Sequence, residues 1–200
     1  AHELGLDHHM VGVAGQEVTT FVYGHFNAFP LLMDPELPNL GAIWPHDKNP
    51  HELFEAIRAQ GPGDEIIQVN HPRGPSLSSY FSFVGLESES SEVVDEENWS
   101  LNWDVIEVFN GGCGSNQALQ DWIGFTNNGI PKTLGSGSDT HAESDPPGLP
   151  RNWIRIDEET VRENNGSLVP VVRARSLFVS CGPFVRFEAV GDDGETLAHL

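Results

Sequence analysis

The chain has 200 residues, of which 38% are hydrophobic, with 21 glycines and 14 prolines. This length and composition predict a single globular α/β domain over residues 1–200 and exclude a fibrous or low-complexity chain. Thirty acidic and ten basic residues give a formal net charge of −20, which disfavours nucleic acid and anionic membranes as partners. We interpret this acidity as a solvated surface rather than as a cation-attracting one.

The first half of the chain predicts two strands and one long helix. After the tail of a helix over residues 1–7, a small and apolar run over residues 10–16 is expected to be a strand that ends on Glu17. A helix should begin at Asn49 as its cap, with Pro50 in the first helical position. Its buried face is predicted to consist of Leu53, Phe54 and Ile57. Residues 65–70 form the next short strand, which ends just before His71.

The second half continues the alternation of strands and helices. Residues 103–109 and 131–136 are expected to be strands, separated by a helix that starts at Ser115. That helix is predicted to bury Leu119, Trp122 and Ile123. A short helix over residues 157–165, a helical turn after Ser167, and strands over residues 177–180 and 184–190 complete the chain, with residues 177–200 forming a β extension.

Asp139 and His141 stand two residues apart directly after a predicted strand, so their side chains point to the same side. A carboxylate oxygen and an imidazole nitrogen suit zinc, manganese or iron. Alone, such a pair is weak evidence for a metal site. Three further runs also lead into polar groups, namely those that precede Glu17 and His25, His71, and Asn110. In parallel α/β architectures such groups gather at the carboxyl ends of the strands, which predicts one shared site.

Five motifs occur in order along the chain: Glu-x7-Gly-His-Phe-Asn-Ala-Phe, Val-Asn-His-Pro-Arg, Ile-Glu-Val-Phe-Asn-Gly, Gly-Ser-Asp-Thr-His and Gly-Leu-Pro-Arg-Asn-Trp. Together they resemble the PHP (polymerase and histidinol phosphatase) superfamily, and most closely its carbaryl-hydrolase (CehA/McbA) branch, over residues 15–190. The resemblance implies a distorted (β/α)7 barrel with two or three divalent ions at the carboxyl ends of its strands. Its metal-ligand motifs fall on Glu17, His25, His71, Asp139 and His141.

The activity that this resemblance implies is hydrolysis of a phosphoester, carbamate or ester bond of a small molecule by a metal-activated water. Asp139 and His71 are the expected catalytic residues. Arg73, Arg151 and Asn27 are the expected substrate-binding residues, although each arginine could equally form a structural salt bridge and Asn27 could support a turn. Glu107 is left out of the ligand set, because it could face the interior or the covering helices.

The chain departs from the family at its amino terminus. The His-x-His and Thr-Asp-His motifs of the family's first two strands are missing, so the chain looks amino-terminally truncated. The alternative function is therefore a fragment that binds metal without turnover. An open sheet edge would require self-association or rearrangement. A calcium-binding surface domain is disfavoured, because calcium prefers oxygen ligands and three of the predicted ligands are histidines. Cys113 and Cys181 are expected to be buried thiols, with their pairing left open.

Overall fold

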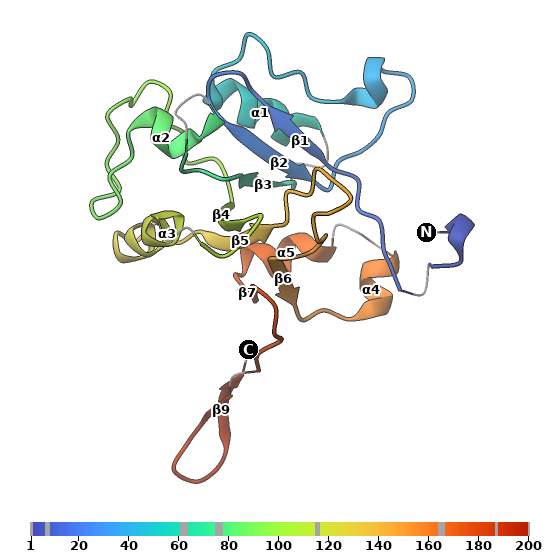
Figure 1. The fold of residues 1–200 in the computed structure, drawn as a ribbon, viewed down its shortest axis with the longest axis vertical. Coiled ribbons are helices and arrows are strands. Elements are labelled where there is room, and N and C mark those ends of the chain that lie inside the picture. The colour runs from blue at the N-terminus through green and yellow to red at the C-terminus, as the bar shows by residue number, and fades with distance from the viewer. Residues whose placement is uncertain are drawn as a thin grey trace.

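The computed structural model describes residues 2–6, 9–60, 64–74, 78–114, 117–163, 167–186 and 188–199. A five-stranded mixed sheet in the order β1-β2-β3-β4-β5 forms its centre (Figure 1). The strands of this sheet are β1 (Gln16–Thr19), β2 (His25–Phe29), β3 (Ile66–Val69), β4 (Val105–Asn110) and β5 (Thr133–Gly137). The helices are α1 (Pro50–Gln60), α2 (Tyr80–Val84), α3 (Gln117–Asn127), α4 (Glu158–Glu163) and α5 (Leu168–Arg173), with 3-10 turns at His2–Leu4 and Pro38–Gly41.

The predicted (β/α)7 barrel is wrong. The described strands form an open sheet in which β1, β2 and β3 are antiparallel neighbours and only β3, β4 and β5 are parallel. The reason lies in the connection between β1 and β2, which is far too short for the crossover that parallel strands need. Thr20 closes it as a tight turn, because its backbone N–H and its hydroxyl both donate to the carbonyl of Gly24.

Helix α1 confirms the prediction for residues 50–60. Its amino terminus carries a capping box, in which the Asn49 side chain accepts from the Glu52 N–H and the Glu52 carboxylate accepts from the Asn49 N–H, both at 3.0 Å. Leu53, Phe54 and Ile57 are fully buried, as predicted. The local cap and the apolar spacing point to the same helix, which is why this element could be predicted from the sequence.

Helix α3 exists, and its buried face overlaps the predicted one in part, because Leu119 and Trp122 are half-buried against the core. Asp121 and Phe125 are buried, whereas Ile123 is 38% exposed. The shift arises because Asp121 is drawn inward by an ion pair with Arg73, which a hydrophobic pattern does not register. The predicted start at Ser115 lies outside the described residues, as does the predicted end of the helix over residues 157–165.

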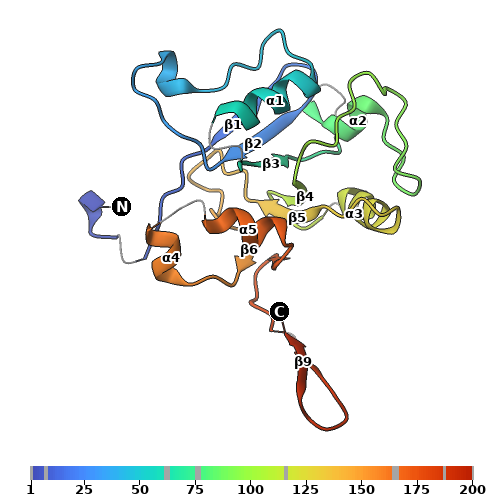
Figure 2. The ribbon, with the colours of Figure 1, turned by 180° about the vertical axis from the view of Figure 1, so that it is seen from behind.

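The predicted strand over residues 10–16 is also shifted along the chain. The strand is β1, so Glu17 lies within it rather than after it. At the other end of the chain, β6 (Arg151–Ile154) was not predicted, and β7 (Leu177–Ser180) confirms a predicted strand. The last pair, β8 (Glu188–Val190) and β9 (Thr196–His199), forms a hairpin that extends away from the other elements in both views (Figures 1 and 2).

The two faces of the sheet differ in what covers them. On one face, Val18, Phe26, Ile67, Val69 and Ile106 pack against residues of α1, α2 and α3. The opposite face is formed by the residues that alternate with these along each strand. Its apolar part includes Ile66 and Val105, which pack against Val169 and Val172 of α5. The rest of this second face carries polar side chains from β1 to β4, namely Glu17, Asn27, Gln68 and Glu107. Strand alternation therefore gathers polar side chains on one part of this face, beside the apolar part that α5 covers.

The β6–β7 pair packs beside β5. The side-chain amide of Asn152 on β6 accepts from the Ser136 N–H at 2.8 Å and donates to the Ser136 carbonyl at 2.9 Å. One side chain thus satisfies both backbone groups of a residue on β5, as a neighbouring strand would. No helix within the described ranges combines the length and the apolar character needed to cross a membrane.

Cys113 and Cys181 form a disulfide, so the expectation of buried thiols is wrong; both residues are exposed. The bond joins the loop after β4 to the end of β7 across 68 positions. Closing a loop of this length restricts the unfolded chain, and replacing both cysteines by serine should lower the free energy of unfolding by about 4 kcal/mol. Urea denaturation of the oxidised protein and the double variant would measure this. An unchanged midpoint with an unchanged slope would contradict a structural role for the bond.

Candidate metal centre

Three side chains that the sequence predicts as metal ligands come together on the polar part of the sheet. His25 Nδ1 lies 3.1 Å from His71 Nε2 and 3.4 Å from Glu17 Oε1, and His71 Nε2 lies 3.9 Å from the same carboxylate oxygen. Glu17 belongs to β1, and His25 is the first residue of β2. His71 is the second residue after the end of β3, with Asn70 between them. β2 runs antiparallel to both β1 and β3. Its first residue, His25, therefore lies beside the carboxyl ends of these two strands.

The spacing of these atoms fits a single divalent ion. Ligand atoms that each lie about 2.1 Å from one tetrahedral ion are about 3.4 Å from each other. The three observed distances, 3.1, 3.4 and 3.9 Å, bracket that value. Burial lowers the pKa of His25, and the neighbouring His71 lowers it further, against the opposing effect of Glu17 and Asp139. A neutral imidazole is the form that binds a metal, so the surroundings of His25 favour its ligand form.

A chain of amide side chains holds the Glu17 carboxylate in place. Gln68 donates to Asn70 Oδ1 at 3.0 Å, and Asn70 Nδ2 donates to Glu17 Oε1 at 3.1 Å. Gln68 and Asn70 are both buried. Hydrogen bonds of this kind orient ligand side chains in metal sites. Asn70 therefore supports a candidate ligand directly.

Glu107, which sequence reasoning left out, supports the other side of the cluster. Its buried carboxylate accepts from the His71 N–H at 2.6 Å and from Asn110 Nδ2 at 3.1 Å. Gly137 on the neighbouring strand leaves room for it, since a Cβ at that position would collide with Glu107 Oε1. The sequence of β4 carried the missed signal, because Glu107 is its one charged residue and has apolar residues on both sides.

Burial raises the pKa of the Glu107 carboxyl to about 7 from an ordinary 4.5, and the carboxylates of Asp139 and Glu17 raise it further, against the hydrogen bonds from His71 and Asn110. Below pH 4.5 both folded and unfolded chains are protonated there. Between pH 4.5 and about 7 only the unfolded chain loses the proton, so stability falls as the pH rises.

We therefore expect the metal-free wild type to lose about 3 kcal/mol of unfolding free energy relative to a Glu107→Gln variant across this interval. Urea unfolding in EDTA at a series of pH values would measure the difference. A difference that stays constant with pH would contradict the raised pKa.

Asp139 and His141, the pair singled out first in the sequence, lie close to this cluster but do not complete it. The Asp139 carboxylate is within electrostatic range, because it raises the pKa of both His25 and Glu107. The side chain of His141 is 75% exposed, and its Nδ1 lies 2.6 Å from the backbone carbonyl of Asp139. This contact and the Asp139 carboxylate raise the pKa of His141, which favours the protonated form over the ligand form.

Two residues of the site have strained backbones. His71 (φ 25°) and Asp139 (φ 48°) are non-glycine residues in the left-handed region, and each follows the end of a parallel strand. Such conformations are unfavourable for side chains with a Cβ and concentrate at functional sites. The strained residues lie at the carboxyl ends of β3 and β5, near the candidate ligands, and this observation is independent of the ligand spacing.

The three predicted substrate-binding residues lie in different surroundings. Asn27 pairs with Glu17 across β1 and β2, and both line a depression of about 430 Å³. Arg151 opens β6 with its guanidinium 5.8 Å from the centre of the Trp153 ring. Arg73 is bound away from the cluster in an ion pair with Asp121, which is the salt-bridge alternative considered for it. Of the three, Asn27 is the residue that the structure places beside the ligands.

No protein-family model matches the sequence, and a search of curated proteins found no match. The resemblance to the PHP superfamily therefore stays a prediction.

Proposed function

We propose that the protein binds a divalent transition metal through Glu17, His25 and His71 and uses it to hydrolyse a small-molecule ester, carbamate or phosphoester. The observation that carries the proposal is the convergence of one carboxylate and two imidazoles, with ligand atoms that all lie within 4.8 Å of one another. Two nitrogens and one oxygen suit zinc, manganese or iron. A centre with three protein ligands leaves a coordination position for water.

The bound ion would supply Lewis acidity, which lowers the pKa of a water molecule toward neutrality. The residues of the chain divide the remaining tasks. His25 and His71 offer ring nitrogens, Glu17 offers a carboxylate oxygen, and Asn70 fixes the direction of that carboxylate. Asp139 adds a negative charge near the cluster and would be the group that accepts a proton from water. Asn27, which lines the depression beside Glu17, would contact the substrate.

The alternative is a chain that binds metal without turnover. One observation favours it: Asp139 and His141 do not join the three-ligand group, so the described site is smaller than the cluster that the resemblance implies. Both proposals predict metal binding and differ only in hydrolysis.

Turnover measurements separate the two. EDTA-treated protein, reloaded with zinc or manganese and freed of excess ion, would be assayed with p-nitrophenyl acetate, p-nitrophenyl phosphate and a naphthyl carbamate. The hydrolase proposal expects metal-dependent turnover that His71→Ala abolishes and Asp139→Asn reduces at equal metal content. Bound metal without turnover on any substrate would establish the binding-only alternative. Equal turnover in wild type and His71→Ala would contradict the site.

A further inference from the structure

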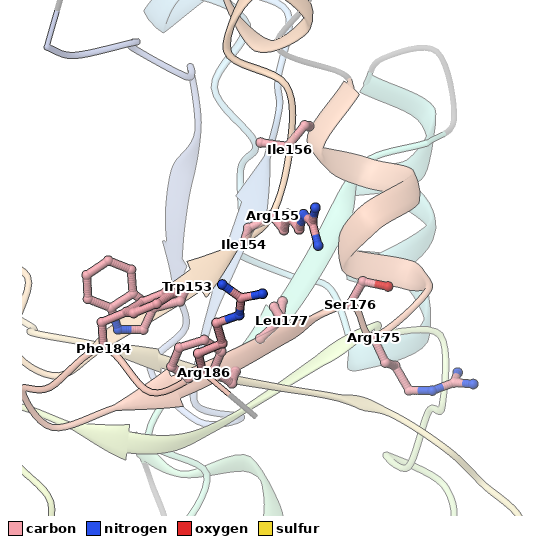
Figure 3. A pocket seen from close by; sticks show the side chains of 10 residues that line it. Trp153, Ile154, Arg155, Ile156, Arg175, Ser176, Leu177, Phe184 and Arg186 are labelled. Carbon is pink, nitrogen blue, oxygen red and sulfur yellow. The ribbon is translucent and has the colours of Figure 1, made fainter. Parts of the chain in front are cut away.

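A second candidate site lies at the other end of the sheet, on the β6–β7 pair. There the structure has a pocket of about 800 Å³ with an aromatic wall and three arginines (Figure 3). None of its lining residues belongs to the Glu17, His25 and His71 cluster. The pocket and the metal centre can therefore be tested independently.

The aromatic wall is formed by Trp153, Phe178 and Phe184. The Trp153 ring stacks on Phe178 with centroids 6.2 Å apart, and Phe184 meets Trp153 edge-on at 5.1 Å. Phe184 is nevertheless 62% exposed, so a large part of this apolar surface faces the solvent. The indole Nε1 of Trp153 is buried and has no hydrogen-bond partner among the described residues.

Arg155, Arg175 and Arg186 bring three of the ten basic residues of the chain to this pocket. Arg186 pairs with Glu188, whereas neither Arg155 nor Arg175 forms an ion pair within the part of the chain that the structure describes. In Figure 3 the side chains of Arg155 and Arg186 reach into the space between Trp153 and Ser176, and Arg175 turns outward. In a protein with a net charge of −20, this local excess of positive charge is selective for anions.

We propose that this pocket binds an aromatic oxyanion, that is, a carboxylate or phosphate carried on an aromatic body. The aromatic body would lie against Trp153 and Phe184, where exposed ring surface would be removed from water. The oxyanion would accept hydrogen bonds from the guanidinium groups of Arg155 and Arg186, whose planar donors match both carboxylate and phosphate. Neither feature alone selects such a ligand, whereas an apolar wall beside two guanidinium groups does, of which that of Arg155 has no ion-pair partner among the described residues and that of Arg186 pairs with Glu188.

Calorimetric titration of the EDTA-treated protein with three probes tests the proposal: 2-naphthoate, 2-naphthyl phosphate and the neutral 2-naphthylmethanol. Metal-free conditions keep the outcome separate from that of the metal centre. We expect one or both anions to bind more tightly than the alcohol, and the tighter of the two identifies the preferred oxyanion.

Two arginine variants and a matched control locate the binding. Arg155→Gln and Arg186→Gln should each weaken anion binding by roughly fivefold, as expected for partly exposed charge pairs. Arg162→Gln removes an equal charge from α4, outside the pocket, and should leave binding unchanged. The proposal is overturned if the alcohol binds as tightly as the anions, if no probe binds, or if Arg162→Gln weakens binding as much as Arg155→Gln does.

Discussion

Replacing Asp121 by alanine should lower the free energy of unfolding by about 3–5 kcal/mol, because it leaves a buried guanidinium without its counter-ion. Arg73 Nε and Nη2 contact the two oxygens of Asp121 at 2.7 and 2.5 Å, and Ser88 Oγ donates to Asp121 Oδ1. The Asp121 side chain is fully buried and that of Arg73 is 9% exposed. Guanidinium denaturation of wild type and variant would measure the loss.

A double-mutant cycle separates the ion pair from the unpaired charge. Arg73→Met should destabilise the protein as Asp121→Ala does, since each leaves one partner buried alone. The combination Arg73→Met/Asp121→Ala removes both charges and should be markedly more stable than the sum of the two single losses predicts. Additive losses would show that the two residues do not form the pair that ties the loop after β3 to α3.

The second large effect concerns metal affinity. His71→Ala and Glu17→Gln should each weaken zinc binding by roughly a hundredfold or more, since a lost ligand has a larger effect than the lost supporting contact for which ten- to hundredfold losses are typical. Asn70→Ala leaves the three ligands in place but removes the hydrogen bonds that link Gln68 through Asn70 to Glu17, and it should weaken binding by about tenfold. Competition titration against a chromogenic chelator would measure these affinities.

His46→Ala provides the matched control for these variants. His46 is also a histidine near aromatic residues, stacked on Phe21 at 5.3 Å and edge-on to Trp44 at 4.5 Å, but it does not belong to the ligand group. Its loss should leave zinc affinity unchanged. If His46→Ala weakens binding as strongly as His71→Ala, the zinc is held elsewhere.

The elements that could be predicted from the sequence are those whose signals are local in the chain. Helix α1 could be predicted because its cap at Asn49 and Glu52 and its apolar face lie within one stretch of chain. The sheet topology could not, since the direction of β2 depends on the turn between Thr20 and Gly24 and on pairing with β3, which is distant in the sequence. The resemblance to a barrel family supplied parallel strands that this turn does not permit.

The sequence predicted the convergence of three candidate ligands but not the residues that support them. Glu17, His25 and His71 converge as expected of ligands, although the edge at which they meet is built from antiparallel strands as well as parallel ones. The buried support from Glu107 escaped prediction, because the side that a strand residue faces follows from the sheet that it joins. Arg73 beside His71 looked equally suited to an anion and to a salt bridge, and only its distant partner Asp121 decides between them.

Glu107 also links the fold to the proposed chemistry. Its carboxylate binds the backbone of His71, and a Cβ at position 137 would displace it. The glycine two residues before Asp139 therefore accommodates a supporting carboxylate. The motif around Asp139 therefore acts on the cluster in two ways. Gly137 leaves room for the Glu107 carboxylate, and the charge of Asp139 raises the pKa of His25 and Glu107.

The most direct test of the metal centre is X-ray absorption at the zinc edge of the zinc-loaded protein. The structure predicts one carboxylate oxygen and two imidazole nitrogens at about 2.0–2.2 Å, with the outer-shell scattering of two histidine rings. His25→Ala should reduce this to one ring. A shell of oxygens alone, sulfur scattering, or two rings persisting in His25→Ala would contradict the assignment of Glu17, His25 and His71 as the metal ligands.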